Sequence, residues 1–131
     1  DPTFLFAVEG TDRNGKKHSY HRAIEFTKEY VTKNSADGFV TLSTVIDGIP
    51  AGEYRVEEAA PVMRYVLTDV AAGSSNISVV KREVEEVNGF MKIEADVAAD
   101  LRDMDGEVTF ENHKTRYDKV SHNSMVINDI S

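Results

Sequence analysis

The sequence contains no cysteine and no tryptophan, and only three prolines among its 131 residues. The absence of cysteine excludes disulfides, thiolate nucleophiles and cysteine-type zinc sites together. No apolar run has the length of a membrane span, and the first residues lack the basic-then-apolar order of a signal peptide. We therefore expect no membrane partner. Because the chain opens directly on strand-like residues, "DPTFLF", we expect it to be a piece of a longer protein.

Acidic residues outnumber basic ones by 23 to 15, which gives a formal net charge of −8. No basic patch is visible, and this disfavours nucleic acid or an anionic membrane surface as a partner. The hydrophobic content of 40% and the charged content of 29% are typical of globular proteins. A chain of this length most simply forms one domain with a substantial core.

Apolar residues recur with a period of two. The run "TFLFAVEG" places Phe4, Phe6 and Val8 on one face, and Asn14-Gly15 is a strong hairpin signal. Similar runs lie at 18–26, 39–46, 53–58, 63–70, 77–84, 90–97 and 106–112, between short segments rich in glycine, asparagine and aspartate. This pattern predicts an all-β fold, an antiparallel sandwich or barrel. Residues 80–87 would also suit a single helical turn.

Two of these runs end with a polar residue on the buried face. Glu58 follows Tyr54 and Val56 in phase, and Asn112 follows Phe110 in the same way. Burial of either side chain without a partner costs about 1–3 kcal/mol or more. Three interpretations remain open: exposure at the rim of the sandwich, which periodicity alone favours; a direct Glu58–Asn112 hydrogen bond; or chemistry that involves a third group.

Two motifs in these runs resemble a known family. "GIPAGEYRVEEAAPVMRY" resembles the L-P-x-G-x-Y-x-V-x-E stretch of collagen-adhesin B-type (Cna-B-like) repeats, and "GEVTFEN" resembles their closing F-x-N strand. The opening residues are similar to the second strand and hairpin of the same domains. The resemblance implies a transthyretin/prealbumin-like β-sandwich of Ig-like architecture over residues 1–113, lacking its first strand. Residues 114–131 would then be a linker or an extra edge strand.

The resemblance also implies a reaction. Many such domains join a lysine to an asparagine through an isopeptide bond promoted by a glutamate, and the motifs match Glu58 as that catalytic group and Asn112 as the bond-forming residue. The matching lysine would lie upstream of Asp1 or has been lost. Lys28 shares the buried phase of Ile24, but we expect a solvated turn residue there. Lys16, Lys17 and Lys92 are expected in a hairpin tip or on a wet face, so we predict that this chain alone cannot close the bond.

No other motif indicates chemistry. The four histidines, His18, His21, His113 and His122, show no metal-ligand spacing and are expected at the surface. Residues 101–112 resemble a calcium loop only superficially, because the first and twelfth positions are wrong. We therefore predict no metal, no cofactor and no enzyme beyond single-turnover self-cross-linking.

The preferred hypothesis is a structural or adhesive stalk module of an extracellular, cell-wall-anchored bacterial protein or pilin. Its partners would be neighbouring domains or subunits of the same surface protein, together with a host or matrix ligand. One alternative is a carbohydrate-binding module, which requires an exposed row of aromatic residues. A second is a transthyretin-like enzyme or regulatory domain, which requires a cluster of histidine and arginine.

Overall fold

The computed structural model describes residues 3–25, 39–59, 64–115 and 120–129. These residues contain β-strands and no helix, so none of them forms a helix that could cross a membrane. The strands are β1 (Thr3–Asp12), β2 (Lys17–Glu25), β3 (Phe39–Ile49), β4 (Gly52–Glu58), β5 (Tyr65–Ala72), β6 (Ile77–Val87), β7 (Phe90–Asp100), β8 (Gly106–Lys114) and β9 (Val120–Asp129).

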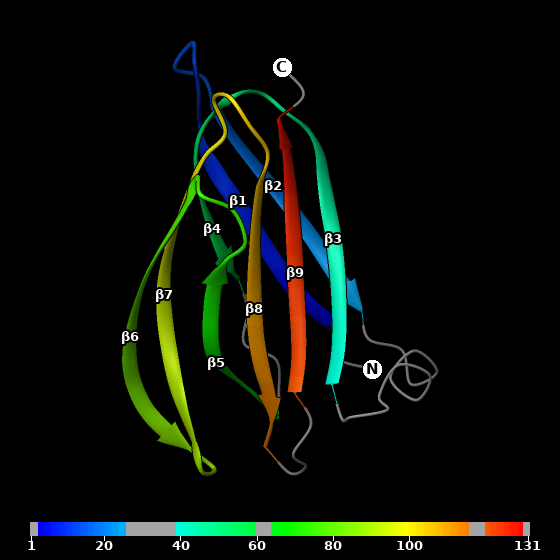
Figure 1. Cartoon of the computed structure of the whole chain (residues 1–131), viewed down its shortest axis with the longest axis vertical. Coiled ribbons are helices and arrows are strands. Elements are labelled where there is room, and N and C mark those ends of the chain that lie inside the picture. The colour runs from blue at the N-terminus through cyan, green and yellow to red at the C-terminus, as the bar shows by residue number, and fades with distance from the viewer. Residues whose placement is uncertain (1–2, 26–38, 60–63, 116–119, 130–131) are drawn as a thin grey trace.

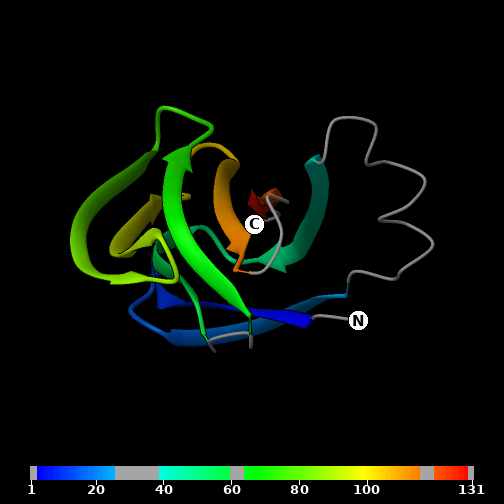
Figure 2. The same cartoon turned by 90° about the horizontal axis from the view of Figure 1, so that it is seen from below.

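The strands form two sheets that pack face to face, as Figures 1 and 2 show. The first has five strands in the order β2-β1-β4-β7-β6, and the second has four in the order β3-β9-β8-β5. The prediction of an all-β sandwich is therefore confirmed. The second sheet is mixed rather than purely antiparallel, because β3 and β9 run parallel. Strand direction between distant segments leaves no trace in the apolar period, so the sequence could not show it.

The C-terminal strand β9 lies inside the second sheet. It pairs with β8 from Gly106↔Ile127 to His113↔Val120, and on its other side it pairs with β3. An extra edge strand or a linker was expected in this part of the chain. Instead, the strand formed by residues 120–129 has a neighbour on each side.

The core lies between the two sheets and uses the faces that the alternation predicted. Phe4, Phe6 and Val8 are completely buried. The rings of Phe6 and Phe110 lie 4.9 Å apart and join β1 to β8 across the sandwich. Full burial of such a side chain contributes about 1.5–3 kcal/mol, so this inward face is the main source of stability.

Residues 80–87 are part of strand β6 and do not form a helical turn. β6 pairs with β7 down to Val87↔Phe90, and Asn88 and Gly89 make the turn between them with positive φ angles of 48° and 87°. Asn-Gly turns of this kind match the twist of a hairpin. The hairpin therefore determines the conformation of this segment.

β1 and β4 approach each other closely at two glycines. A Cβ atom on Gly10 would lie 2.6 Å from the Cα atom of Tyr54, and one on Gly52 would lie 2.7 Å from the Cα atom of Asp12. Real Cβ atoms essentially never come so close to backbone. Both positions therefore require glycine for space rather than for a special φ angle.

We predict that Gly10→Ala lowers the free energy of unfolding by about 1–3 kcal/mol or more, because β1 and β4 must separate to admit the methyl group. Gly89→Ala is the comparison, since its φ of 87° opposes a side chain but no atom lies within 4 Å of the added Cβ. That strain costs about 1–2 kcal/mol. Urea unfolding of both variants measures the difference, and a Gly10→Ala protein as stable as the wild type would contradict the close approach.

Candidate functional site

Glu58 and Asn112 meet between the two sheets. Glu58 ends β4 opposite Phe6 of β1, and Asn112 lies in β8 opposite Leu67. The Nδ2 atom of Asn112 donates a hydrogen bond of 3.2 Å to the Oε2 atom of Glu58. Asn112 is only 1% exposed, so it does not lie at a wet rim, whereas Glu58 is partly exposed. Of the three interpretations left open by the sequence, the structure shows the direct hydrogen bond.

Glu58 is largely buried next to aromatic side chains, and this burial alters its acidity. Two aromatic contacts lie beside the pair, Phe6 with Phe110 and Phe4 with Tyr65, the latter an edge-to-face contact with ring centres 5.2 Å apart. Burial raises the pKa of Glu58 from 4.5 to about 7, although the hydrogen bond from Asn112 acts in the opposite direction. At neutral pH the carboxyl group can therefore either donate or accept a proton.

The lysines occupy different places around the fold. Lys16 and Lys17 are exposed near the β1–β2 turn, and Lys81 pairs with Asp69 at 2.7 Å. Lys92 was expected on a wet face, but it is half-buried and lines the same cavity as Glu58 and Asn112. Lys28 lies outside the described residues.

Asn123 is a second buried carboxamide, and it was not predicted from the sequence. Asn123 lies in β9 opposite Phe110 and is 1% exposed, and neither polar atom of its side chain has a hydrogen-bond partner among the described residues. An unpaired buried amide costs about 1–3 kcal/mol. Asn123, Met125 and Ile127 alternate, which would indicate that Asn123 faces the core, but this pattern is informative only if the segment is a strand.

Three of the four histidines contact carboxylates. His18 lies 2.8 Å from Asp12, and His113 and His122 lie 3.0 Å and 3.3 Å from the two oxygens of Glu111. Burial raises the pKa of Glu111, but hydrogen bonds from Thr68 and His113 and the charges of both histidines outweigh it, so the net shift is downward. His21, in contrast, is exposed. Of the four histidines that were expected at the surface, three are therefore partly buried: His18, His113 and His122.

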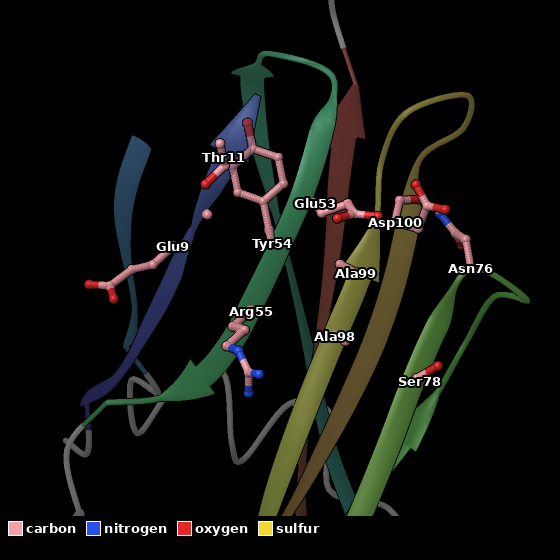
Figure 3. Close-up of a pocket in the computed structure, with 11 residues that line it drawn as sticks. Glu9, Thr11, Glu53, Tyr54, Arg55, Asn76, Ser78, Ala98, Ala99 and Asp100 are labelled. Atoms are coloured by element: carbon pink, nitrogen blue, oxygen red, sulfur yellow. The ribbon is translucent and has the colours of Figure 1, made fainter. Parts of the chain in front are cut away.

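A hollow on the outer face of β1, β4 and β7 is shown in Figure 3. It has a volume of about 490 Å³, and the small residues Gly10, Ala98 and Ala99 line it. At one end of the hollow, Asp100 accepts a hydrogen bond from Arg102, which lowers the pKa of Asp100 to about 2. Figure 3 shows Glu9 and Arg55 pointing in different directions, so the charged groups do not converge on one point.

Comparison of the chain with family models, curated proteins and solved structures finds no match. The candidate site is therefore defined by its own geometry. It is a partly buried carboxyl–carboxamide pair in which the pKa of the carboxyl group is near neutral pH.

We predict that Glu58 makes stability depend on pH between about 4.5 and 7. In this window the folded protein keeps a proton that the unfolded chain releases, so the free energy of unfolding falls as pH rises, by about 3 kcal/mol in total. Glu58→Gln lacks this pH dependence, so its free energy of unfolding relative to the wild type should rise by about 3 kcal/mol between pH 4 and pH 8. Urea unfolding at both pH values measures the difference.

The exposed neighbour Glu57 supplies the control for this experiment. Glu57→Gln removes a carboxyl group from the same strand without changing the buried pair, so its stability relative to the wild type should vary by less than about 0.5 kcal/mol over the same range. A Glu58→Gln protein whose relative stability is equally constant would show that Glu58 titrates as it does in water.

Proposed function

We propose that the chain is a structural module of a bacterial surface protein, of the collagen-adhesin B-type kind, and that it forms one isopeptide bond at Asn112. The observation that supports this most directly is the partly buried hydrogen bond from Asn112 to Glu58, which joins the two residues that the sequence motifs match. The module's partners would be neighbouring domains or subunits of the same protein.

The reaction begins with the neutral amine of a lysine outside the described residues. Its Nζ atom attacks the Cγ atom of Asn112, and the bond from Cγ to Nδ2 breaks. The protonated Glu58 gives its proton to the leaving nitrogen and takes one from the attacking nitrogen, so that ammonia departs and Glu58 is protonated again. One amine and one carboxamide become one secondary amide and ammonia, and neither an oxidant nor a reductant is needed.

Position and acidity both suit Glu58 to this role. A group that accepts and returns a proton works best with a pKa near the working pH, and the pKa of Glu58 is about 7. Fixing the amine and the amide in contact supplies several kcal/mol of the barrier reduction. Burial of an incoming lysine next to Asn112 would favour its neutral, nucleophilic form.

The product would stabilise a chain that has no cysteine. β8 pairs with β5 on one side and β9 on the other, so a covalent link at Asn112 would attach another segment to the middle of the second sheet. Such a link restricts the unfolded chain as a disulfide does, without depending on redox conditions.

The aromatic residues give no specific support to carbohydrate binding. Tyr65 and Phe90 are half-buried, with Tyr65 packed on Phe4 and Phe90 on His113, whose ring centre lies 4.8 Å away. Tyr30 and the side chain of Phe39 lie outside the part that the structure describes. An exposed aromatic row is therefore not formed by Tyr65 and Phe90.

We predict that the natural full-length protein is lighter than its sequence requires by one molecule of ammonia for this module. Intact-mass spectrometry under denaturing conditions measures the loss, and fragmentation of a proteolytic digest identifies which lysine is joined to Asn112. Asn112→Ala and Glu58→Ala should each restore the full mass. An unchanged mass in the folded wild-type protein would overturn the cross-link.

Asn123→Ala is the matched control, because Asn123 is as deeply buried as Asn112 but has no hydrogen bond to Glu58. This variant should keep the loss of ammonia. If it restored the full mass as Asn112→Ala does, the bond would not be specific to Asn112.

A further inference from the structure

Strand β3 forms one edge of the four-stranded sheet. It pairs with β9 along one side, from Phe39↔Val120 to Ile46↔Ile127. On its other side it has no strand partner among the described residues, because it stands at the end of the order β3-β9-β8-β5. Figure 1 shows β3 at one side of the molecule and β6 at the other. Backbone N–H and C=O groups on that side of β3 can therefore pair with a further strand.

The sequence of β3 lacks the features that keep an edge strand from pairing. Natural edge strands are protected by charged residues, proline or bulges. Residues 39–46, "FVTLSTVI", contain no charged residue, no proline and no glycine, and all except Leu42 and Ser43 are β-branched or aromatic. The register shift in this strand comes only after Ile46, and the first charged residue is Asp47. Residues 39–46 therefore favour strand pairing and carry nothing that opposes it.

The edge strands β5 and β6 are protected in both of these ways. The pairing of β6 shifts register between Glu83 and Glu85, and the pairing of β5 shifts between Leu67 and Asp69. The two edges also lie against each other, because Lys81 of β6 forms an ion pair with Asp69 of β5 at 2.7 Å. A further strand is therefore opposed on this side of the sandwich by charge, by irregular backbone and by the contact itself.

The remaining edge strand, β2, carries charge along its length. Lys17, Arg22 and Glu25 are distributed over it. Arg22 also reaches β3, where its Nε atom donates a hydrogen bond of 3.0 Å to the hydroxyl oxygen of Thr44. This contact uses the side chain of Thr44, so it does not occupy the backbone edge of β3. Among the described strands at the sheet edges, β3 is thus the one without protection.

A second copy of the same chain suits this edge. Each copy has a formal net charge of −8, so two copies repel each other over most of their surfaces. Pairing through residues 39–46 places no like charges opposite each other within that segment. Because each copy has one unprotected edge among its described strands, a pair of copies uses both edges, and the assembly closes at two.

The register of such a pair is restricted by the faces of the sheet. Directly opposed residues of a continuous sheet lie on the same face, so the two-fold axis of two identical antiparallel strands must pass through a residue. An axis at Leu42 or Ser43 keeps most of residues 39–46 paired. It also holds the Asp47 residues of the two copies at opposite ends of the paired segment. Val45, which is 39% exposed, then gains a neighbouring strand.

We propose that β3 pairs with β3 of a second copy in antiparallel orientation, and that the two four-stranded sheets become one continuous sheet in a two-fold symmetric dimer. The inference goes beyond the proposed function, because it assigns the module a partner and a contact surface. It does not depend on the cross-link at Asn112.

Sedimentation velocity of the 131-residue chain measures its state of association. An interface made by a single strand pair is small and therefore weak, so monomer should convert to dimer as the concentration rises from about 1 to about 100 µM. Hydrogen exchange followed by NMR locates the contact in the same samples. Backbone amides within residues 39–46 should exchange more slowly at the higher concentration, and those of β6 should not change.

Two matched pairs of variants test the edge. Because the axis lies at or next to residue 43, Ser43→Lys brings the new charges of the two copies close together, and dimerisation should weaken about fivefold or more. Ser78→Lys makes the same change at an exposed position of the protected strand β6 and should have no effect. Val45→Lys and Val80→Lys repeat the comparison at two exposed valines of the same strands. Urea unfolding checks that each variant is folded.

A wild-type chain that remains monomeric at the highest concentration would overturn the proposal, and so would assemblies larger than a dimer. A dimer that withstands both lysine substitutions in β3 would also contradict it, as would one that the β6 controls weaken equally, because its interface would lie elsewhere. If neither β3 variant folds, the exchange experiment on the wild type decides alone. Exchange within residues 39–46 that does not change with concentration would exclude this contact.

Discussion

The contact between the rings of Phe6 and Phe110, with centres 4.9 Å apart, joins the five-stranded sheet to the four-stranded one. Glu58 lies opposite Phe6 in the first sheet, and Asn112 follows Phe110 by two residues in the second. The same packing that stabilises the sandwich therefore brings the carboxyl group and the carboxamide together. It also buries Asn112 and most of Glu58, and this burial raises the pKa of Glu58 to about 7. The packing of the two sheets therefore also determines the acidity of Glu58.

Local pattern was sufficient to predict most of the strands and the inward phase of Glu58 and Asn112. The alternation of Phe4, Phe6 and Val8 identified a face that is fully buried. The same rule placed Glu58 and Asn112 on buried faces of two distant strands. A period of two identifies buried residues here because successive side chains of a strand point to opposite faces of its sheet, and one of those faces packs on the core. The hydrogen bond between the pair was one of three open interpretations, because the end of a strand and the rim of a sandwich look alike in sequence.

Features that depend on pairing between distant segments were not predictable. The insertion of β9 between β3 and β8 makes Asn123 a core residue, although the polar stretch before β9 indicated a linker or an edge strand. The position of Lys92 in the same cavity as the pair has a similar origin. It follows from the point where β4 and β7 stop pairing, at Val56↔Val97. No property of either strand alone specifies that point, since it depends on the register and twist of the complete sheet.

The partial burial of Glu58 also affects the energetics of the reaction proposed at Asn112. An ionised Glu58 is costly in an apolar interior, and so is a lysine ammonium brought next to it. The pair can lower this cost by moving the proton from nitrogen to oxygen, because burial lowers the pKa of an amine and raises that of a carboxyl group. The result is a neutral amine and a protonated acid, which are the forms that attack on Asn112 requires. Amide formation then makes the neutral state permanent, since an amide nitrogen no longer takes up a proton near neutral pH. The electrostatic cost of burying the two charged groups would thus favour the reaction at Asn112, because the neutral product no longer carries that cost.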